Sequence, residues 1–532
     1  MSLQFITGNS GNGKTKYLFN RIVKEAKANP RDNYLVIVPE QFTMQTQRQL
    51  VDLSENKAIM NIDVLSFKRL AYRVFDELGI TNLTVLEETG KNLVLRKLAA
   101  QEADKLGVIG RNLNRIGYIS EVKSLLSELV QYNISPEELG RYIVSGRLSD
   151  TLSDKLKDVL VLYEAFEKFM KDKYITAEEI LNVLCNVAEE SAILRNSVIA
   201  FDEFTGFTPI QNQLIKKLFV ISKKIYVTLT IDCREDIFKS RGMQELFDMP
   251  KRTVKSLTEM AAFYGIEVEE PIILDKNYRL AENEELSFME QQLFRKRRCS
   301  FKKVPKHIHI DCLRDPKQEL TKIARRINEL VRNENLRYRD IAIVTGDVNI
   351  YAGYVREIFD KYNIPYFIDA TQEILFHPFI EFIRSIPDIA AQNFSADAVF
   401  RFLRCGFSEL LDSEIDVLEN YVLACGVRGK SAWDKKWVRL PKHKAGYDIE
   451  LLNQSREYIM ELLKPVYQVF SDKKSTVKDY VLAIYKLIVL LDIPDKLAKK
   501  EQALLDAGDQ TASKEYGQIY KIVMQLFEKY VA

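Results

Sequence analysis

The stretch FITGNSGNGKTKYL, residues 5–18, limits what this chain can fold into more than any other. A short apolar run leads into the pattern G-x-x-x-x-G-K-[S/T], and a helical pattern follows. Glycines let backbone N–H groups turn inward around phosphates, the Lys reaches phosphate oxygens, and the Thr hydroxyl ligates Mg²⁺. The stretch therefore predicts a strand, a nucleotide-binding loop and a helix, with the loop formed by Gly8, Asn9, Ser10, Gly11, Asn12, Gly13, Lys14 and Thr15.

Short apolar runs alternate with helical stretches through the first 80 residues, as in LQFIT, YLVIVPE and IDVLSF. Strand patterns return at SVIAFDE (197–203) and KIYVTLTID (224–232), after a helical region with start signals at SPEEL and TAEEI. This alternation predicts an α/β fold with a parallel sheet covered by helices. The expected domains are a first α/β lobe (1–86 and 197–285), a helical insertion (87–196), the start of a second lobe (286–376) and a second helical insertion (377–532).

The second lobe is expected from strand patterns at HIHIDC, DIAIVTG and IPYFID. The last helical segment, QIYKIVMQLFEKYVA, is amphipathic and has no capping stop, which predicts that the second insertion is incomplete.

Composition excludes several classes of protein. No apolar run approaches the roughly 18 residues of a membrane helix. Six scattered cysteines without a C-x-x-C pair favour a reducing cytoplasm over a zinc or disulfide framework. The net charge of +2 means that any contact with nucleic acid must come from local patches. The stretch Arg295–Lys306 is such a patch, and it reads either as a solvated linker or as a crossing point for a strand.

A pair of acids ends the strand VIAF. In a phosphate-loop protein, Asp202 would complete the Mg²⁺ shell through water and Glu203 would orient or deprotonate the attacking water. The long separation of these acids from Lys14 is typical of helicases and disfavours a small-molecule kinase. Farther along, Tyr278 could stack on the base and Arg279 could reach the γ-phosphate.

Two polar and aromatic sets follow the second and third predicted strands, at the edge where parallel sheets bind ligands. They combine hydrogen-bonding, stacking and cationic groups, the mixture found in single-stranded DNA grooves. Core packing remains the alternative for each aromatic. The candidate DNA-binding residues are Gln41, Phe42, Thr43, Ser66, Phe67, Arg69 and Tyr72.

With these motifs in place, the chain resembles the N-terminal part of the AddB family, whose members form bacterial AddAB helicase–nucleases together with AddA. The matching stretches are GNSGNGKT, VPEQFTMQTQRQLV, VLSFKRLAYRV, AFDEFTGFTPIQ and IAIVTGDVNIYAGYVREIFDKYNIPYFID with FHPFIEFIRS. The resemblance implies a superfamily 1 helicase architecture, in which two RecA-like P-loop lobes each carry an inserted helical domain.

The resemblance also implies a role in double-strand break repair by recombination, within an ATP-dependent helicase/deoxyribonuclease. An AddA-type partner would drive translocation, while the AddB-type protein binds ATP–Mg²⁺, engages DNA ends and single strands, and scans for the Chi sequence. An iron–sulfur cluster and nuclease centre would belong to a C-terminal region outside this chain. Positions matching the family's DNA-scanning surface are Gln41, Thr43, Phe67 and Arg69, with Tyr72, Phe204 and Phe207 as further candidates.

Departures from the motor pattern predict weak catalysis. Motor helicases of this superfamily carry a Gln after the strand equivalent to YVTLTID, where this chain has Asp232, Cys233 and Arg234. Later motifs, including the arginine finger, and the nuclease residues are missing. We therefore expect a weak ATPase without nuclease activity. An autonomous superfamily 1 helicase and a non-catalytic DNA-scanning scaffold with a structural nucleotide remain alternatives.

Overall fold

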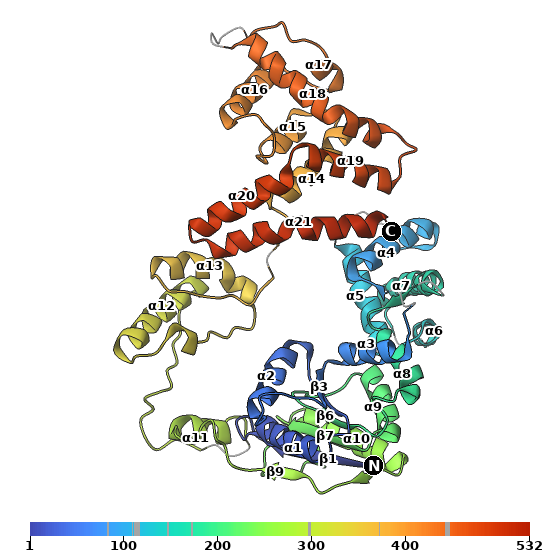
Figure 1. The fold of residues 1–532 in the computed structure, drawn as a ribbon, viewed down its shortest axis with the longest axis vertical. Coiled ribbons are helices and arrows are strands. Elements are labelled where there is room, and N and C mark those ends of the chain that lie inside the picture. Colours follow the sequence, from blue (N-terminus) through green and yellow to red (C-terminus); the bar gives the residue numbers. More distant parts are fainter. Residues whose placement is uncertain are drawn as a thin grey trace. The chain divides into compact units, whose positions relative to one another are not determined.

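The computed structural model describes residues 1–81, 85–108, 110, 117–145, 148–171, 174–295, 299–371, 373–441 and 447–531. The chain divides into two compact units, Met1–Asp311 and Cys312–Ala532. Figure 1 shows the helices and strands that make up each unit.

A parallel sheet organises the first unit, as the alternating sequence pattern predicts. Its strand order is β3-β2-β6-β7-β1-β8, and β9 also pairs with β1. All of these pairings are parallel. The strands are β1 (Ser2–Gly8), β2 (Tyr34–Ile37), β3 (Ile62–Leu65), β6 (Val198–Phe201), β7 (Lys224–Thr230), β8 (Glu267–Val268) and β9 (Ile272–Leu274).

Helices cover both faces of this sheet, so successive strand residues enter two different cores. In β1, Phe5 contributes to one core and Ile6 to the other. The core around Ile6 is completed by α1 (Lys14–Ala28) and α2 (Thr43–Leu53). The core around Phe5 is completed by α3 (Phe67–Leu78), α8 (Ile180–Val187), α9 (Pro209–Ile221) and α10 (Asp248–Phe263). The helix α11 (Glu284–Gln292) follows β9.

Between β3 and β6 lies a group of helices with a hydrophobic core of its own. Its elements are α4 (Glu88–Gln101), α5 (Tyr118–Gln131), α6 (Pro136–Val144) and α7 (Asp150–Met170), with the short strands β4 (Val85–Leu86) and β5 (Ile175–Thr176) at its base.

The predicted helix start at Ser135 is confirmed by a capping box with Glu138. The other predicted start, Thr176, ends β5, and α8 begins at Ile180. Because α8 packs against the sheet, part of the region 87–196 contributes to the core of the α/β lobe.

The second unit contains helices and, in its described residues, no paired strand. A helix pair, α12 (Pro316–Asn333) and α13 (Val348–Lys361), has a small core of its own. A larger core joins α14 (Pro378–Ala391), α15 (Ala396–Leu403), α16 (Asp412–Cys425), α17 (Lys430–Asp434), α18 (Ile449–Ser471), α19 (Val477–Leu490), α20 (Ile493–Asp506) and α21 (Gln510–Val531).

The three strands expected in the region 286–376 are not formed. Residues 307–312, 341–346 and 364–369 are all described, and none of them is a paired strand. Ile364 packs against α12 and α13, but Val344 and Phe367 are 92% and 88% exposed. A parallel strand depends on neighbouring strands that pair with its backbone, and none of these segments has such a partner among the described residues.

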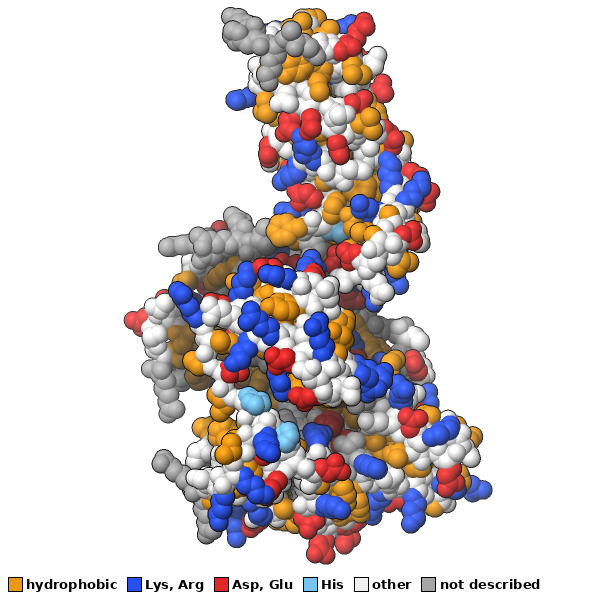
Figure 2. Space-filling model, turned by 90° about the vertical axis from the view of Figure 1, so that its left-hand side faces the viewer, with side chains coloured by type: hydrophobic (Ala, Val, Ile, Leu, Met, Phe, Trp, Pro, Cys, Tyr) orange, Lys and Arg blue, Asp and Glu red, His pale blue; other side chains and the backbone are white. Residues whose placement is uncertain are grey.

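Basic and acidic side chains are interspersed on the face shown in Figure 2, consistent with the small net charge. The basic stretch Arg295–Lys306 includes residues 296–298, which lie outside the described part of the chain, so its role stays a prediction. Among the helices that the structure describes, none combines the length and hydropathy needed to cross a bilayer.

A buried histidine caps α14. The Nδ1 atom of His377 accepts the backbone N–H of Phe379 at 3.1 Å, while Nε2 is buried without a partner among the described residues. Burial lowers the pKa of His377. Protonation would place a proton on Nδ1 and remove the cap acceptor.

We expect the second unit to lose stability as the pH falls below about 6.5, the ordinary pKa of histidine. Because the pKa of His377 is lower in the folded state, the unfolded chain takes up the proton at a higher pH than the folded chain does. The free energy of unfolding therefore declines as the pH falls from the unfolded-state pKa towards the folded-state pKa. Asn can cap a helix and does not titrate. The free energy of unfolding of His377→Asn should therefore decline less than that of the wild type between pH 7.5 and 5.5. Urea denaturation monitored by hydrogen exchange in α14 would measure both. Equal declines in both proteins would contradict the assignment.

Candidate nucleotide site and adjoining surfaces

The phosphate-binding loop joins the end of β1 to the start of α1. Gly11 and Gly13 have φ angles of 92° and 80°, which glycine adopts readily and other residues adopt at a cost. The helix begins at Lys14, directly after Gly13, so free backbone N–H groups of its first turn face the loop. This is the strand, glycine loop and helix start that the sequence predicted, and a helix start of this kind can bind an anion; phosphate binding itself stays a prediction.

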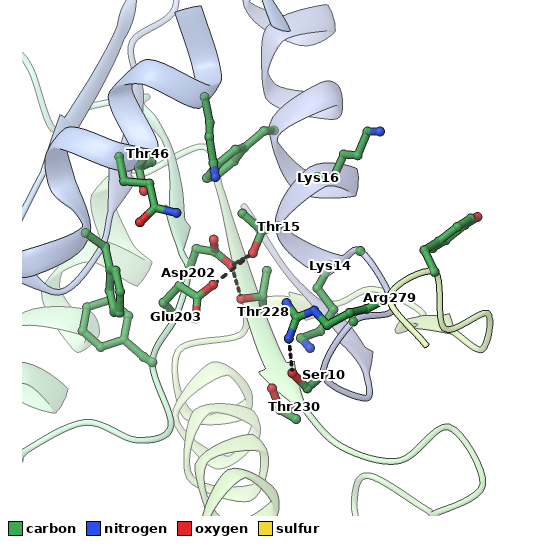
Figure 3. A pocket seen from close by; sticks show the side chains of 18 of the residues that line it. Ser10, Lys14, Thr15, Lys16, Thr46, Asp202, Glu203, Thr228, Thr230 and Arg279 are labelled. Atoms are coloured by element: carbon green, nitrogen blue, oxygen red, sulfur yellow. Dashed lines mark hydrogen bonds between the residues drawn. The ribbon is translucent and has the colours of Figure 1, made fainter. Parts of the chain in front are cut away.

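Four predicted residues converge beside this loop (Figure 3). The Thr15 hydroxyl lies 3.3 Å from Asp202 Oδ1 and 3.3 Å from Glu203 Oε1. Lys14 Nζ donates to the carbonyl oxygens of Gly8 and Asn9, at 3.1 and 3.0 Å. The structure therefore brings together the loop and the acids that the sequence places nearly 190 residues apart.

Burial perturbs both charged groups at the centre of the site. Burial lowers the pKa of Lys14, against the attraction of Glu203 and Asp202. Burial raises the pKa of Asp202, while hydrogen bonds from Thr228 and Thr15 oppose the rise. Each group would hold its charge more readily if an ion of opposite charge were bound beside it.

The residues present suit a magnesium ion carried by a nucleotide. Asp202 is 1% exposed, and its Oδ2 atom is buried without a hydrogen-bond partner among the described residues. The described residues contain no group of three or more His, Cys, Asp or Glu that could hold a metal. Thr15 and Asp202 can therefore supply only part of a shell, and Mg²⁺ commonly takes the rest from phosphates and water.

The segment that follows β9 lies directly against the loop. The Tyr278 N–H donates to Gly11 O at 3.0 Å, and Asn277 Nδ2 donates to Ser10 O at 3.1 Å. Arg279 Nη1 donates to Ser10 Oγ at 3.3 Å. The predicted base-stacking and γ-phosphate residues thus border the nucleotide loop, and the Tyr278 ring is largely exposed.

A cavity of about 850 Å³ extends from the loop along α2. Its lining includes Lys14, Thr15, Asp202, Glu203, Tyr278 and Arg279. Sequence reasoning missed several other lining residues, namely Lys16, Gln45, Thr46, Gln49, Asp52, Thr228 and Thr230. The polar residues after Phe42 recur every three to four positions, which places them on one face of a helix. This spacing could have identified the face of α2 that lines the cavity.

The predicted DNA-binding residues divide into buried and exposed groups. Gln41, Arg69 and Tyr72 are exposed. Thr43 is buried, and its hydroxyl donates to Glu40 O at 3.0 Å. Ser66 is buried and caps α3 by accepting the Arg69 N–H. The two hydroxyl residues therefore hold helix starts in place.

Most of the predicted aromatics pack together. Phe67 is 7% exposed and lies within 5.5 to 6.3 Å of the rings of Phe201, Phe204 and Phe207. Phe42 differs, because it lines the 850 Å³ cavity beside the loop. A second cavity of about 310 Å³ borders this aromatic group, lined by Val38, Pro39, Glu40, Ser66, Phe67, Lys68, Ala177, Ile180, Leu181, Phe204 and Gln211.

At the end of β7, Asp232 is held by two arginines. Arg234 and Arg295 bond its carboxylate, with shortest contacts of 2.5 and 2.8 Å. Burial alone would raise the pKa of Asp232, but the hydrogen bonds from Arg234 and Arg295 lower it. Asp232 is not among the residues that line the 850 Å³ cavity.

Comparison with known proteins places these features in a family. The family described as "ADDB, N-terminal" matches residues 5–290. Three relatives, each named as the B-type subunit of an ATP-dependent helicase/deoxyribonuclease, come from Lachnoclostridium phytofermentans (38% identical), Clostridioides difficile (31%) and Clostridium novyi (30%). Each match covers all of this chain but only 46–47% of the relative, so the chain spans about half the length of these relatives.

Packing against Gly11 generates a prediction. A Cβ atom at Gly11 would lie 2.7 Å from Asn277 Oδ1 and 2.8 Å from Arg279 Cβ, whereas a Cβ at Gly79, also at positive φ, would contact nothing within 4 Å. Both Gly→Ala variants should lose about 1–2 kcal/mol to backbone strain. Gly11→Ala should lose more in urea unfolding and expose residues 275–280 to proteolysis. Equal losses and equal proteolysis would show that this contact is unimportant.

Proposed function

Since the chain belongs to the AddB family, through its N-terminal region, we propose that it is the helicase-like part of an AddB-type subunit of an ATP-dependent helicase/deoxyribonuclease. In this role it acts in double-strand break repair by recombination, in the bacterial cytoplasm. The observation that carries the proposal is the convergence of Lys14, Thr15, Asp202 and Glu203 beside the phosphate-binding loop.

ATP binds with its phosphates on this loop and its base beside Tyr278. Lys14 exchanges the carbonyl contacts of Gly8 and Asn9 for phosphate oxygens. Thr15 and Asp202 would hold Mg²⁺, and the ion would neutralise charge on the phosphates. Glu203 orients the attacking water, and Arg279 contacts the terminal phosphate.

Single-stranded DNA crosses the neighbouring edge of the same sheet. The exposed Arg69 neutralises phosphate, while Gln41 and Tyr72 contact bases. Phe67, Phe204 and Phe207 form the floor of this surface, beside the 310 Å³ cavity. Scanning for a Chi sequence would use this surface.

Hydrolysis by the chain is weak. Both oxygens of Asp232 are engaged by arginines at the position where motor relatives carry a coupling Gln. A side chain fixed in this way has no free group with which to sense the γ-phosphate. An AddA-type partner therefore drives translocation on DNA ends, and nuclease chemistry and an iron–sulfur cluster belong to the remaining half of such a protein.

The proposed domains follow the expected order along the chain, although α8 within the insertion range packs into the core of the first lobe. Residues 1–86 and 197–285 form the first RecA-like lobe, and 87–196 form its helical insertion. Residues 286–376 begin a second lobe, and 377–532 belong to a second insertion.

Removal of the loop lysine tests nucleotide binding. Lys14→Ala should weaken binding of Mg²⁺–ATP roughly 10- to 100-fold, because a charge-assisted hydrogen bond contributes about 1.5–3 kcal/mol. Lys24→Ala, which changes an exposed lysine ten residues farther along the same helix and outside the cavity lining, is a matched charge control. Calorimetry would measure both. Unchanged ATP binding in Lys14→Ala would contradict the proposed nucleotide site. Vigorous DNA-stimulated ATP hydrolysis by the wild type would contradict the proposal of weak hydrolysis and would favour an autonomous helicase.

Removal of Arg69 tests the DNA surface. Arg69→Ala should weaken single-stranded DNA binding and reduce the salt slope by about 0.7, the contribution of one phosphate contact. Arg31→Ala changes an exposed arginine just before β2, at the opposite end of the strands, and should leave the slope unchanged. Filter binding over a salt series gives both slopes, and equal slopes for the two variants would place the DNA elsewhere.

A further inference from the structure

The carboxylate of Asp202 is held by a residue that the proposed nucleotide chemistry does not use. The hydroxyl of Thr228 donates to Asp202 Oδ1 at 2.5 Å, the shortest contact that this carboxylate makes among the described residues. Thr228 is 3% exposed and lies on β7, the strand beside the one that carries Asp202. Figure 3 shows its side chain between the carboxylate and the loop.

Strand register explains why the two side chains meet. The last pair of the β6–β7 ladder is Phe201 with Val227, so Asp202 and Thr228 lie one step beyond it. Because side chains alternate along a strand, these two point to the same face as Ala200 and Tyr226, which belong to the core beneath α1. That face also carries the phosphate-binding loop.

The contact differentiates the two carboxylate oxygens. Oδ1 receives the Thr228 hydroxyl and lies 3.3 Å from the Thr15 hydroxyl, whereas Oδ2 is buried and has no partner in the described part of the chain. Threonine is branched at Cβ, which restricts χ1 and gives its hydroxyl a defined direction. The rotation of the Asp202 carboxylate is therefore restrained, with one oxygen left for a further ligand.

We propose that Thr228 is the positioning residue for the divalent cation of this site, holding Asp202 so that Oδ2 remains available to the cation or to its water shell. The inference rests on the proposed nucleotide site and adds a residue to it. Partners that orient a metal-binding side chain commonly affect metal affinity 10- to 100-fold when removed. Thr228 acts in this proposal through its hydrogen bond to the Asp202 carboxylate.

The test measures the Mg²⁺ requirement for binding a fluorescent ATP analogue by the full chain. Thr228→Val keeps the shape and removes the hydroxyl. It should raise the Mg²⁺ concentration for half-maximal binding 10- to 100-fold while leaving the affinity measured in EDTA unchanged. Thr228→Ser should restore the wild-type requirement. Thr7→Val is the matched control, because Thr7 is a buried strand threonine whose hydroxyl has no partner in the described residues.

Two outcomes would overturn the inference. An unchanged Mg²⁺ requirement in Thr228→Val would do so, and so would an equal loss of affinity with Mg²⁺ and in EDTA, which indicates a structural role. A double-mutant cycle adds an independent readout, since Thr228→Val should have no further effect in an Asp202→Asn background. If the wild-type chain binds no nucleotide, the proposed function itself is overturned. If the wild type binds nucleotide in a Mg²⁺-dependent way and Thr228→Val has the same Mg²⁺ requirement, only this inference is overturned.

Discussion

Parallel pairing of β1 with β7, and of β7 with β6, is the constraint on which the candidate site depends. The ladders pair Gly8 with Thr230 and Phe201 with Val227, so the three strands end at one edge of the sheet. The loop after β1 and the acids after β6 meet there, although a whole group of helices separates them in sequence. Such an insertion is tolerated because loop-closure entropy grows only slowly with length, and because the inserted helices bury a core of their own.

Two buried aspartates at this edge lie in different electrostatic environments. Asp232 has both oxygens bonded by arginines, so its charge is neutralised within the protein. Asp202 receives only hydroxyl groups among the described residues, and one of its oxygens has no partner there. Burying a carboxylate is costly unless something compensates its charge. The arginines compensate Asp232 permanently, whereas Asp202 suits a cation that arrives with a ligand.

Close packing around the loop links the nucleotide site to the rest of the first unit. Residues 275–280 approach so tightly that Gly11 has no room for a side chain. The glycine is therefore required by a neighbouring segment as well as by its own backbone angle. Because of this contact, a movement of the phosphate-binding loop would displace the residues that follow β9, where the chain leaves the sheet.

The sequence by itself determined the elements whose signals are local. The glycine loop, the buried strands around it, the two acids after β6 and the capping box at Ser135 were all predictable, because each depends on neighbours a few residues away. Its resemblance to AddB also identified the family that residues 5–290 match. The aromatics after the second and third strands could be located in the chain but not assigned to core or surface.

Only the tertiary structure decided which of those side chains are buried and what they contact. It placed Phe67 in an aromatic cluster, left Tyr72 39% exposed and joined Thr228 to Asp202. It also left residues 307–312, 341–346 and 364–369 unpaired despite their strand-like sequences. The physical reason is the same in each case: strand pairing and burial are set by partners distant in sequence, which a local pattern does not contain.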